Sequence, residues 1–156
     1  MSDKQRREIL AVGLLAAAVF VLLALLPVGL LGSRGPEWFP SGNIMGVAGN
    51  WLREPLVALF GAAAPLLAAA LGVGALSAAD RSGGRGWHWT ALSGGLLVLV
   101  PTLIWVALPN AEPAAGWIGA TVGGPLTGLV GRFGAVFVTS VLLVVLAVAT
   151  LEWSAV

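Results

Sequence analysis

The side chains that could carry out chemistry are few in this chain of 156 residues. His88 is the only histidine, Lys4 is the only lysine, and there is no cysteine. A metal centre, a haem held by two histidines and a hydrolase triad each need more such residues. A nucleotide-binding P-loop needs a lysine after its glycines, and Lys4 does not follow that pattern. We therefore predict no catalytic residue, no cofactor, no metal site and no enzyme activity for this chain.

His88 itself stands between two tryptophans, Trp87 and Trp89. Neutral imidazole and indole both suit the headgroup depth of a bilayer, so an interfacial position is favoured over a ligand role. With a net charge of +1 the chain also has no basic surface for DNA. Direct binding of nucleic acid by this chain is not expected.

Four runs without a charged side chain separate these polar residues, and each is 19 to 25 residues long: Ile9–Leu31, Pro55–Ala79, Trp89–Ala111 and Phe133–Leu151. At about 1.5 Å per residue, a helix of that length matches a hydrocarbon core of roughly 30 Å. The runs are continuous rather than alternating, which favours helices over strands. With 58% hydrophobic and 10% charged residues, the chain cannot cover the surface of a soluble domain. The sequence predicts an all-α membrane protein with four transmembrane helices in one domain, residues 9–151.

Prolines fall inside two of these spans. Pro65 and Pro101 predict kinks in the second and third spans, whereas Pro55 is expected at the start of the second, where a missing N–H costs little. Lysine and arginine in short loops set the orientation. Residues 1–8 and 80–88 hold five of them, against three in 32–54 and 112–132. Residues 1–8 are thus predicted as a cytoplasmic N-terminus and residues 152–156 as a cytoplasmic tail.

Six tryptophans are candidate interface anchors, because indole prefers the headgroup level on both sides of a bilayer. The cytoplasmic ends of the spans would carry Trp87, Trp89 and Trp153, and the outer loops Trp38, Trp51 and Trp117. Trp105 is assigned instead to packing between helices.

The two predicted outer loops are long and rich in glycine. Residues 113–131 carry no charge until Arg132, so a fifth span has to be considered. Their six glycines and two prolines make a poor lipid-facing helix, and an amphipathic or re-entrant segment is favoured. Glycines at small-xxx-small spacing let helices approach closely in lipid, although a flexible loop is the simpler alternative. The candidate residues for packing or self-association are Gly42, Gly46, Gly49, Gly61, Gly119, Gly123, Gly124, Gly128 and Gly134. We expect a homo-oligomer in the lipid bilayer.

The glycine-rich segments also indicate an internal repeat. A shift of 73 positions places Gly46 on Gly119 and the triplet 60–62 on 133–135, with six identities in seventeen positions. The chain is interpreted as two parallel pseudo-repeats, each with a helix, a glycine-rich outer segment and a second helix.

None of the four spans contains an ionisable residue, which argues against proton-coupled transport. A small transporter or channel subunit with two pseudo-repeats remains an alternative, because broken glycine-rich segments line substrate sites in transporters. A structural partner of another membrane complex is a third possibility.

Several motifs resemble the membrane domain of FtsK/SpoIIIE-type DNA translocases. Asn43-x-x-Gly46-x-x-Gly49, Phe60-Gly61 and Pro65 are similar to the start of its second span. Gly123-Gly124, Leu126, Leu129 and Phe133-Gly134 are similar to its last outer loop and fourth span. The resemblance covers roughly residues 7–153.

The resemblance implies a multi-pass anchor in the bacterial inner membrane at the division septum, with both termini in the cytoplasm. It implies a role in cell division and chromosome partition, with division-site membrane proteins as partners. The ATP-driven motor of that family is absent from these residues. The tail 152–156 is expected to lead to a linker and motor that the sequence does not contain.

Overall fold

The computed structural model describes residues 2–32, 35–79, 86–108 and 110–152. All regular structure in these ranges is helical: α1 (Asp3–Leu25), η1 (Val28–Leu31), α2 (Gly35–Trp38), α3 (Gly46–Phe60), η2 (Gly61–Ala63), α4 (Pro65–Ala78), α5 (Gly86–Ala107) and α6 (Glu112–Glu152). The predicted all-helical class is confirmed.

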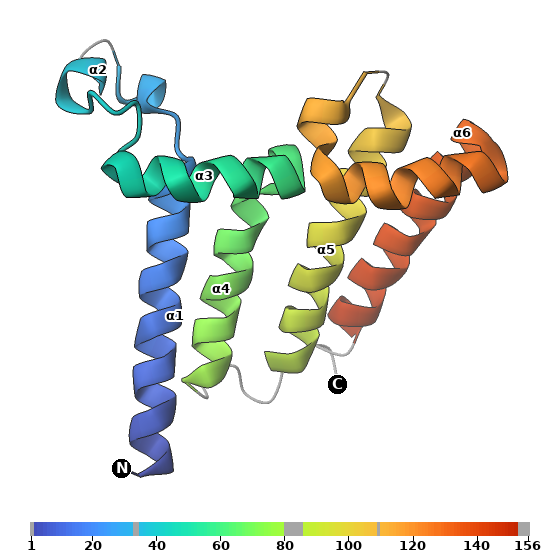
Figure 1. The fold of residues 1–156 in the computed structure, drawn as a ribbon. Helices are drawn as coiled ribbons and strands as arrows, with labels where there is room; N and C mark the ends of the chain where they lie inside the picture. Colours follow the sequence, from blue (N-terminus) through green and yellow to red (C-terminus); the bar gives the residue numbers. More distant parts are fainter. Residues whose placement is uncertain (1, 33–34, 80–85, 109, 153–156) are drawn as a thin grey trace.

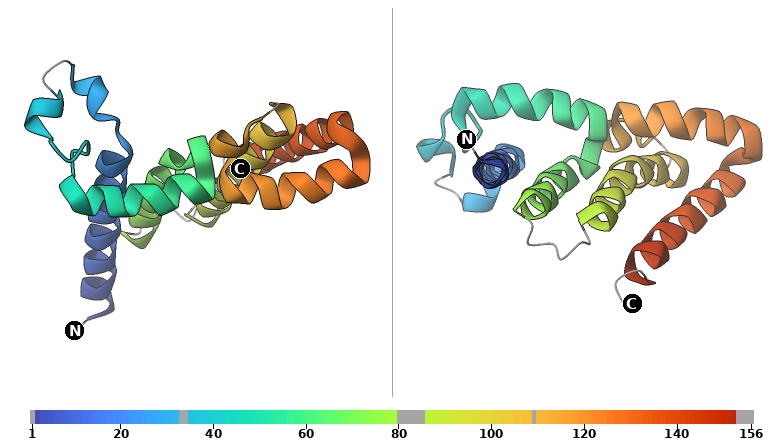
Figure 2. Two further views of the ribbon diagram at one scale, coloured as in Figure 1. Left: turned by 45° about the horizontal axis from the view of Figure 1, so that its top comes forward. Right: turned by 90° about the horizontal axis from the view of Figure 1, so that it is seen from below.

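Four upright segments stand side by side, namely α1, α4, α5 and residues 132–152 of α6 (Figure 1). Two further helices, α3 and residues 117–130 of α6, lie across the upper ends of these upright segments in the view of Figure 1 (Figures 1 and 2). We call these two the crossing helices. Three helices, α1, α5 and α6, are long and apolar enough to cross a bilayer. A fourth span is obtained when the bent pair of α3 and α4 is counted as one.

The second span, expected over residues 55–79 with a kink at Pro65, bends just before that proline and is divided between α3 and α4. The chain bends by 95° between α3 and α4, at the short η2 turn. Gly61 adopts a φ of 57°, which a right-handed helix cannot continue through. Pro65 then occupies the first turn of α4, where its missing N–H would have no partner in any case. Pro55, expected at the start of this span, lies inside α3 instead.

The helix α6 contains two similar breaks. Gly116 (φ 64°) and Gly131 (φ 70°) have non-helical backbone angles and separate the crossing helix 117–130 from its neighbours. The charge-free segment 113–131 is therefore not a fifth upright helix. The fourth span, expected over residues 133–151, falls on residues 132–152.

The first and third spans begin and end earlier than expected. The Ser2 hydroxyl accepts a hydrogen bond from the Gln5 N–H (3.3 Å), and Gln5 accepts one from the Ser2 N–H (3.0 Å). This capping box starts α1 at Asp3, and Pro27 follows its end at Leu25, so α1 covers 3–25 rather than 9–31. Likewise α5 covers Gly86–Ala107 rather than 89–111. Charge alone could not place the ends of α1, because a capping box and a proline set them.

Small side chains allow the upright segments to pack closely. Ala24, Ala115 and Ala135 have no exposed surface. A core cluster of Val21, Leu56, Ala64 and Ala68 joins α1 to the α3–α4 bend. In lipid, such close approach lets dispersion hold helices together. The packing runs α1 on α4, α4 on α5, and α5 on α6.

The internal repeat is present, but its offset is 70 positions and not 73. Each crossing helix lies between two glycines with positive φ, Gly46 and Gly61 in one half and Gly116 and Gly131 in the other. Both pairs are separated by fifteen residues. At this offset the two halves share a Gly-x-x-Gly-x5-Pro-Leu-x-x-Leu-x-Gly pattern. The backbone angles therefore set the offset at 70, and the offset indicated by the Phe-Gly match differs from it by about one helical turn.

Candidate functional site

The two halves meet backbone to backbone where the end of α3 reaches the start of the second crossing helix. A β-carbon on Gly61 would overlap the backbone carbonyl of Ala114. A β-carbon on Gly116 would lie 2.6 Å from the carbonyl oxygen of Leu59. We call this contact the joint. Sequence reasoning selected Gly61 but missed Gly116, which only the 70-residue offset pairs with Gly46.

The second crossing helix rests on α5 through two of the predicted packing glycines. A β-carbon on Gly119 would lie 2.5 Å from the carbonyl oxygen of Pro101, and one on Gly123 would lie 2.5 Å from Cδ1 of Trp105. The small-xxx-small spacing of this pair thus serves a contact inside the chain. Trp105 packs between helices at this contact, as the sequence indicated.

The other predicted glycines have different surroundings. Open space surrounds the Cβ positions of Gly42, Gly46, Gly124 and Gly128, whereas Gly134 has only Val130 of its own helix nearby. The structure does not test self-association, which stays a prediction for these residues. Gly49 is tightly enclosed, because a β-carbon there would overlap the side chain of Asn43.

Asn43 explains the motif Asn43-x-x-Gly46-x-x-Gly49. Its side chain is fully buried and donates a hydrogen bond to the carbonyl oxygen of Ala24 (2.7 Å) near the end of α1. Its Oδ1 accepts a hydrogen bond from the Met45 N–H (2.8 Å). Gly49 leaves the space for this amide. Asn43 therefore connects α1 to α3, a role that the sequence motif did not reveal.

Replacing Asn43 by alanine is expected to destabilise the fold by about 2 kcal/mol, because the buried carbonyl of Ala24 and the partly buried N–H of Met45 lose their partner. The measurement is the free energy of unfolding in detergent micelles. Asn50 is the matched control, since its amide makes one partly buried bond to the Ser41 carbonyl (2.7 Å). An equal loss in both variants would contradict the role assigned to Asn43.

Arg132 has a comparable role in the second half. Its Nε donates to the carbonyl oxygen of Val106 (3.0 Å), and its Nη2 donates to that of Ala107 (3.1 Å). These carbonyls belong to the last turn of α5, where helix acceptors lack partners and a cation is favoured. In each half, a polar side chain that follows the first upright helix in the sequence thus donates a hydrogen bond to a backbone carbonyl near the C-terminal end of that helix.

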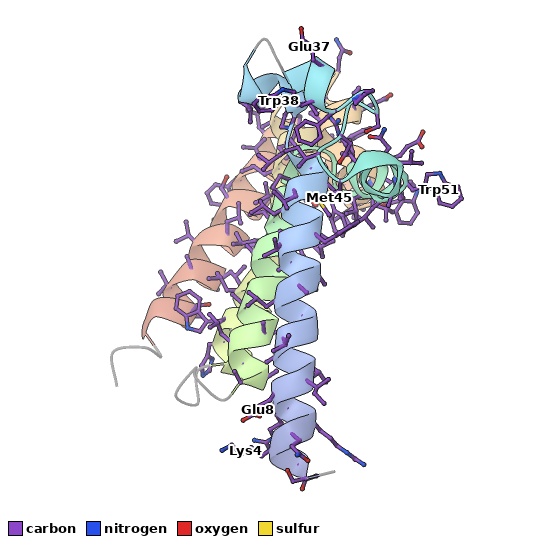
Figure 3. The ribbon with its side chains drawn as sticks, turned by 90° about the vertical axis from the view of Figure 1, so that its left-hand side faces the viewer. Lys4, Glu8, Glu37, Trp38, Met45 and Trp51 are labelled. Carbon is purple, nitrogen blue, oxygen red and sulfur yellow. The ribbon has the colours of Figure 1, made fainter. Side chains whose placement is uncertain are left out.

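The predicted anchor tryptophans lie at both ends of the upright segments. Trp51 and Trp117 are exposed on the crossing helices, and Trp38 is exposed on α2. Trp51 points away from α1 (Figure 3). Trp89 is exposed at the opposite end, in the first turns of α5. Trp153 and the side chain of Trp87 lie outside the described residues. The anchoring role stays a prediction.

Three hydroxyl groups of the upright segments bond within their own helices. The hydroxyls of Thr102, Thr139 and Thr150 donate to carbonyl oxygens four residues earlier, at 2.7–2.8 Å. Thr139 and Thr150 therefore bond within α6 rather than across to a neighbouring helix. Among the residues that the structure describes, no three histidine or acidic side chains gather where they could hold a metal ion.

A hollow of about 640 Å³ lies beside the joint, with Glu54, Glu112, Trp105 and Trp117 among its lining residues. It is open to the surroundings, so its two carboxylates can remain hydrated. Chemically, the site is a set of close backbone contacts beside a mostly apolar hollow that carries two carboxyl groups, and this arrangement suits the positioning of helices.

These features define a class of protein: an all-helical, multi-pass membrane domain whose second and fourth spans each follow a crossing helix. The chain belongs to the family described as the 4TM region of the DNA translocases FtsK and SpoIIIE, which matches residues 3–156. Neither a curated protein nor a solved structure shows significant similarity to the chain. The resemblance inferred from the glycine motifs is confirmed.

Proposed function

We propose that this domain anchors a cytoplasmic DNA-translocating motor to the inner membrane at the division septum, in cell division and chromosome partition. One observation carries the proposal. The start of α1 and the end of α6 both lie at the lower ends of the upright segments, opposite the crossing helices (Figure 1). A motor joined after α6 would therefore lie on the side where α1 begins.

The charge distribution supports a cytoplasmic location for that side. Lys4, Arg6 and Arg7 lie in the first turns of α1, and basic residues favour the cytoplasmic face of a membrane. DNA is in the cytoplasm, so a motor tethered there can reach its substrate. The crossing helices would then lie at the outer surface, with Trp51 and Trp117 at headgroup depth.

The chain itself is proposed to be non-enzymatic and to leave DNA binding and ATP hydrolysis to the motor. Support comes from its upright segments, whose hydroxyls bond to their own helices. Crossing helices at the outer surface would be available to other division-site membrane proteins.

A fluorescent protein fused after Val156 tests this proposal in dividing bacterial cells. We expect fluorescence in the membrane with enrichment at the septum several-fold above the lateral membrane. The matched control is the same fusion with Lys4, Arg6 and Arg7 changed to glutamate, which removes the basic bias at this end. An even membrane distribution would contradict the septal role, and solute flux through the purified chain in liposomes would contradict the anchor role.

A further inference from the structure

The joint between the two halves has a direction. The end of the first crossing helix meets the start of the second, so each half presents one end to its neighbour. The start of the first crossing helix, at Gly46, and the end of the second crossing helix, at Gly131, therefore take no part in this joint. We call them the unpaired ends.

The glycines at these unpaired ends share a positive φ with the glycines at the joint. Gly46 (φ 65°) matches Gly116 (φ 64°), and Gly131 (φ 70°) matches Gly61 (φ 57°). At Gly61 and Gly116 a β-carbon would overlap the other half, whereas nothing lies within 4 Å of the Cβ positions of Gly46 and Gly131. Glycines with positive φ are thus closely packed at the joint and open at the outer ends of the two crossing helices.

Exposure of equivalent positions shows what the second half covers. Leu59 is 39% exposed, but its equivalent Leu129 is 83% exposed. Ala63 is 2% exposed, but its equivalent Phe133 is 94% exposed. The first half is covered at these positions because the second half lies against it, and nothing covers them in the second half.

We propose that a second copy of this chain docks at this end, so that the joint is repeated between copies. Residues 129–133 of one copy would lie against the start of α3 in the next. Phe133 is larger than Ala63 and would reach further, toward the α1 face that exposes Val19 and Leu22. The contact is head to tail, and such contacts close into rings or extend into chains.

Backbone chemistry favours a second copy over lipid as the occupant. The last carbonyls of one crossing helix and the first N–H groups of another carry opposite partial charges, and at the joint these ends are already opposed. Lipid could cover Phe133, but only a second copy would present a helix start with the backbone geometry that the joint already accommodates.

Cysteine crosslinking in membranes tests the proposal, since the native chain contains no cysteine. One tagged copy carries Leu129→Cys, and a second copy with a different tag carries Val47→Cys; both positions are exposed. Their equivalents in the joint are Leu59 and Trp117. A chain with Leu59→Cys and Trp117→Cys is therefore the matched control, and its intrachain crosslink sets the length of the reagent.

We expect an intermolecular product when the two single variants are mixed, several-fold above either variant alone. A chain with both Leu129→Cys and Val47→Cys should give a ladder of products. Either single variant crosslinking efficiently to itself would indicate a two-fold contact and overturn the proposal. A reacting intrachain control without an intermolecular product would assign the end to lipid and also overturn it.

The inference names a partner for the proposed anchor, but its test does not depend on a motor or a septum. Loss of septal enrichment with crosslinks intact would contradict only the proposed function. Absence of crosslinks with septal enrichment intact would contradict only the repeated joint.

Discussion

Replacing Gly61 by alanine is expected to destabilise the domain by about 4 kcal/mol. Two costs combine. A residue with a side chain pays about 1–3 kcal/mol to adopt the backbone angles of Gly61 (φ 57°, ψ -131°), which essentially only glycine adopts. The methyl group also overlaps the carbonyl of Ala114, and forcing atoms into a packed contact costs about 1–3 kcal/mol. Unfolding in mixed micelles, followed by circular dichroism, measures the loss.

Gly131 is the matched control for this variant. Its backbone angles (φ 70°, ψ 168°) also disfavour a side chain, but nothing lies within 4 Å of its Cβ position. Gly131→Ala in detergent-solubilised monomers should therefore lose only the backbone cost, about 1–3 kcal/mol. The difference between the two variants isolates the contact at the joint. Equal losses would show that the backbone angle alone matters and that the halves do not touch at Gly61.

The number and kind of spans could be read from the sequence, because lipid restricts the choice so strongly. An uncharged, apolar run of about 20 residues has few stable positions other than across the bilayer. The α3–α4 region shows where this reasoning ends. Residues 55–79 are apolar throughout, and hydropathy does not distinguish a straight span from one that bends by 95°. Gly61 and Pro65 determine the bend, and their effect depends on a backbone angle that composition does not report.

The candidate site was predicted only in part, for a related reason. Small-xxx-small spacing identified Gly119 and Gly123 as packing residues, but spacing does not say which surface they pack against. They contact α5 of the same chain, so a Gly119→Leu variant would not test self-association by itself. Asn43 and Arg132 were missed as helix-capping residues because their acceptors are 19 and 26 residues earlier in the chain. Such distant partners become visible only when the fold brings them together.

The offset of the internal repeat, in contrast, could have been predicted from the sequence, but a competing match obscured it. Phe60-Gly61 and Phe133-Gly134 are identical, yet Gly61 ends a crossing helix and Gly134 lies inside an upright one. The prolines are the better guide. Pro55 and Pro125 occupy the same place within the two crossing helices at an offset of 70. A glycine pair flanking a proline therefore marks each repeat unit better than shared aromatic residues do.

The contact between the second crossing helix and α5 leads to a prediction in which two similar variants change stability in opposite directions. Gly119→Leu and Gly128→Leu both place leucine on the helix 117–130. Leucine forms helices better than glycine by up to about 1 kcal/mol, so Gly128→Leu, whose Cβ position faces open space, should be neutral or stabilising. At Gly119 the new side chain meets the carbonyl of Pro101 and the side chain of Ala115, both closer than 3 Å.

We expect Gly119→Leu to lose about 2–3 kcal/mol despite its better helix propensity, because the crossing helix must move away from α5. The free energy of unfolding in micelles gives the sign for each variant. Trp105 provides a second measurement, since its ring packs against Gly123 one turn further along, and its fluorescence should change in Gly119→Leu but not in Gly128→Leu. The other tryptophans are retained as a constant background in both variants. A destabilised Gly128→Leu, or a Gly119→Leu as stable as the native chain, would show that α5 and the second crossing helix do not approach each other through these glycines.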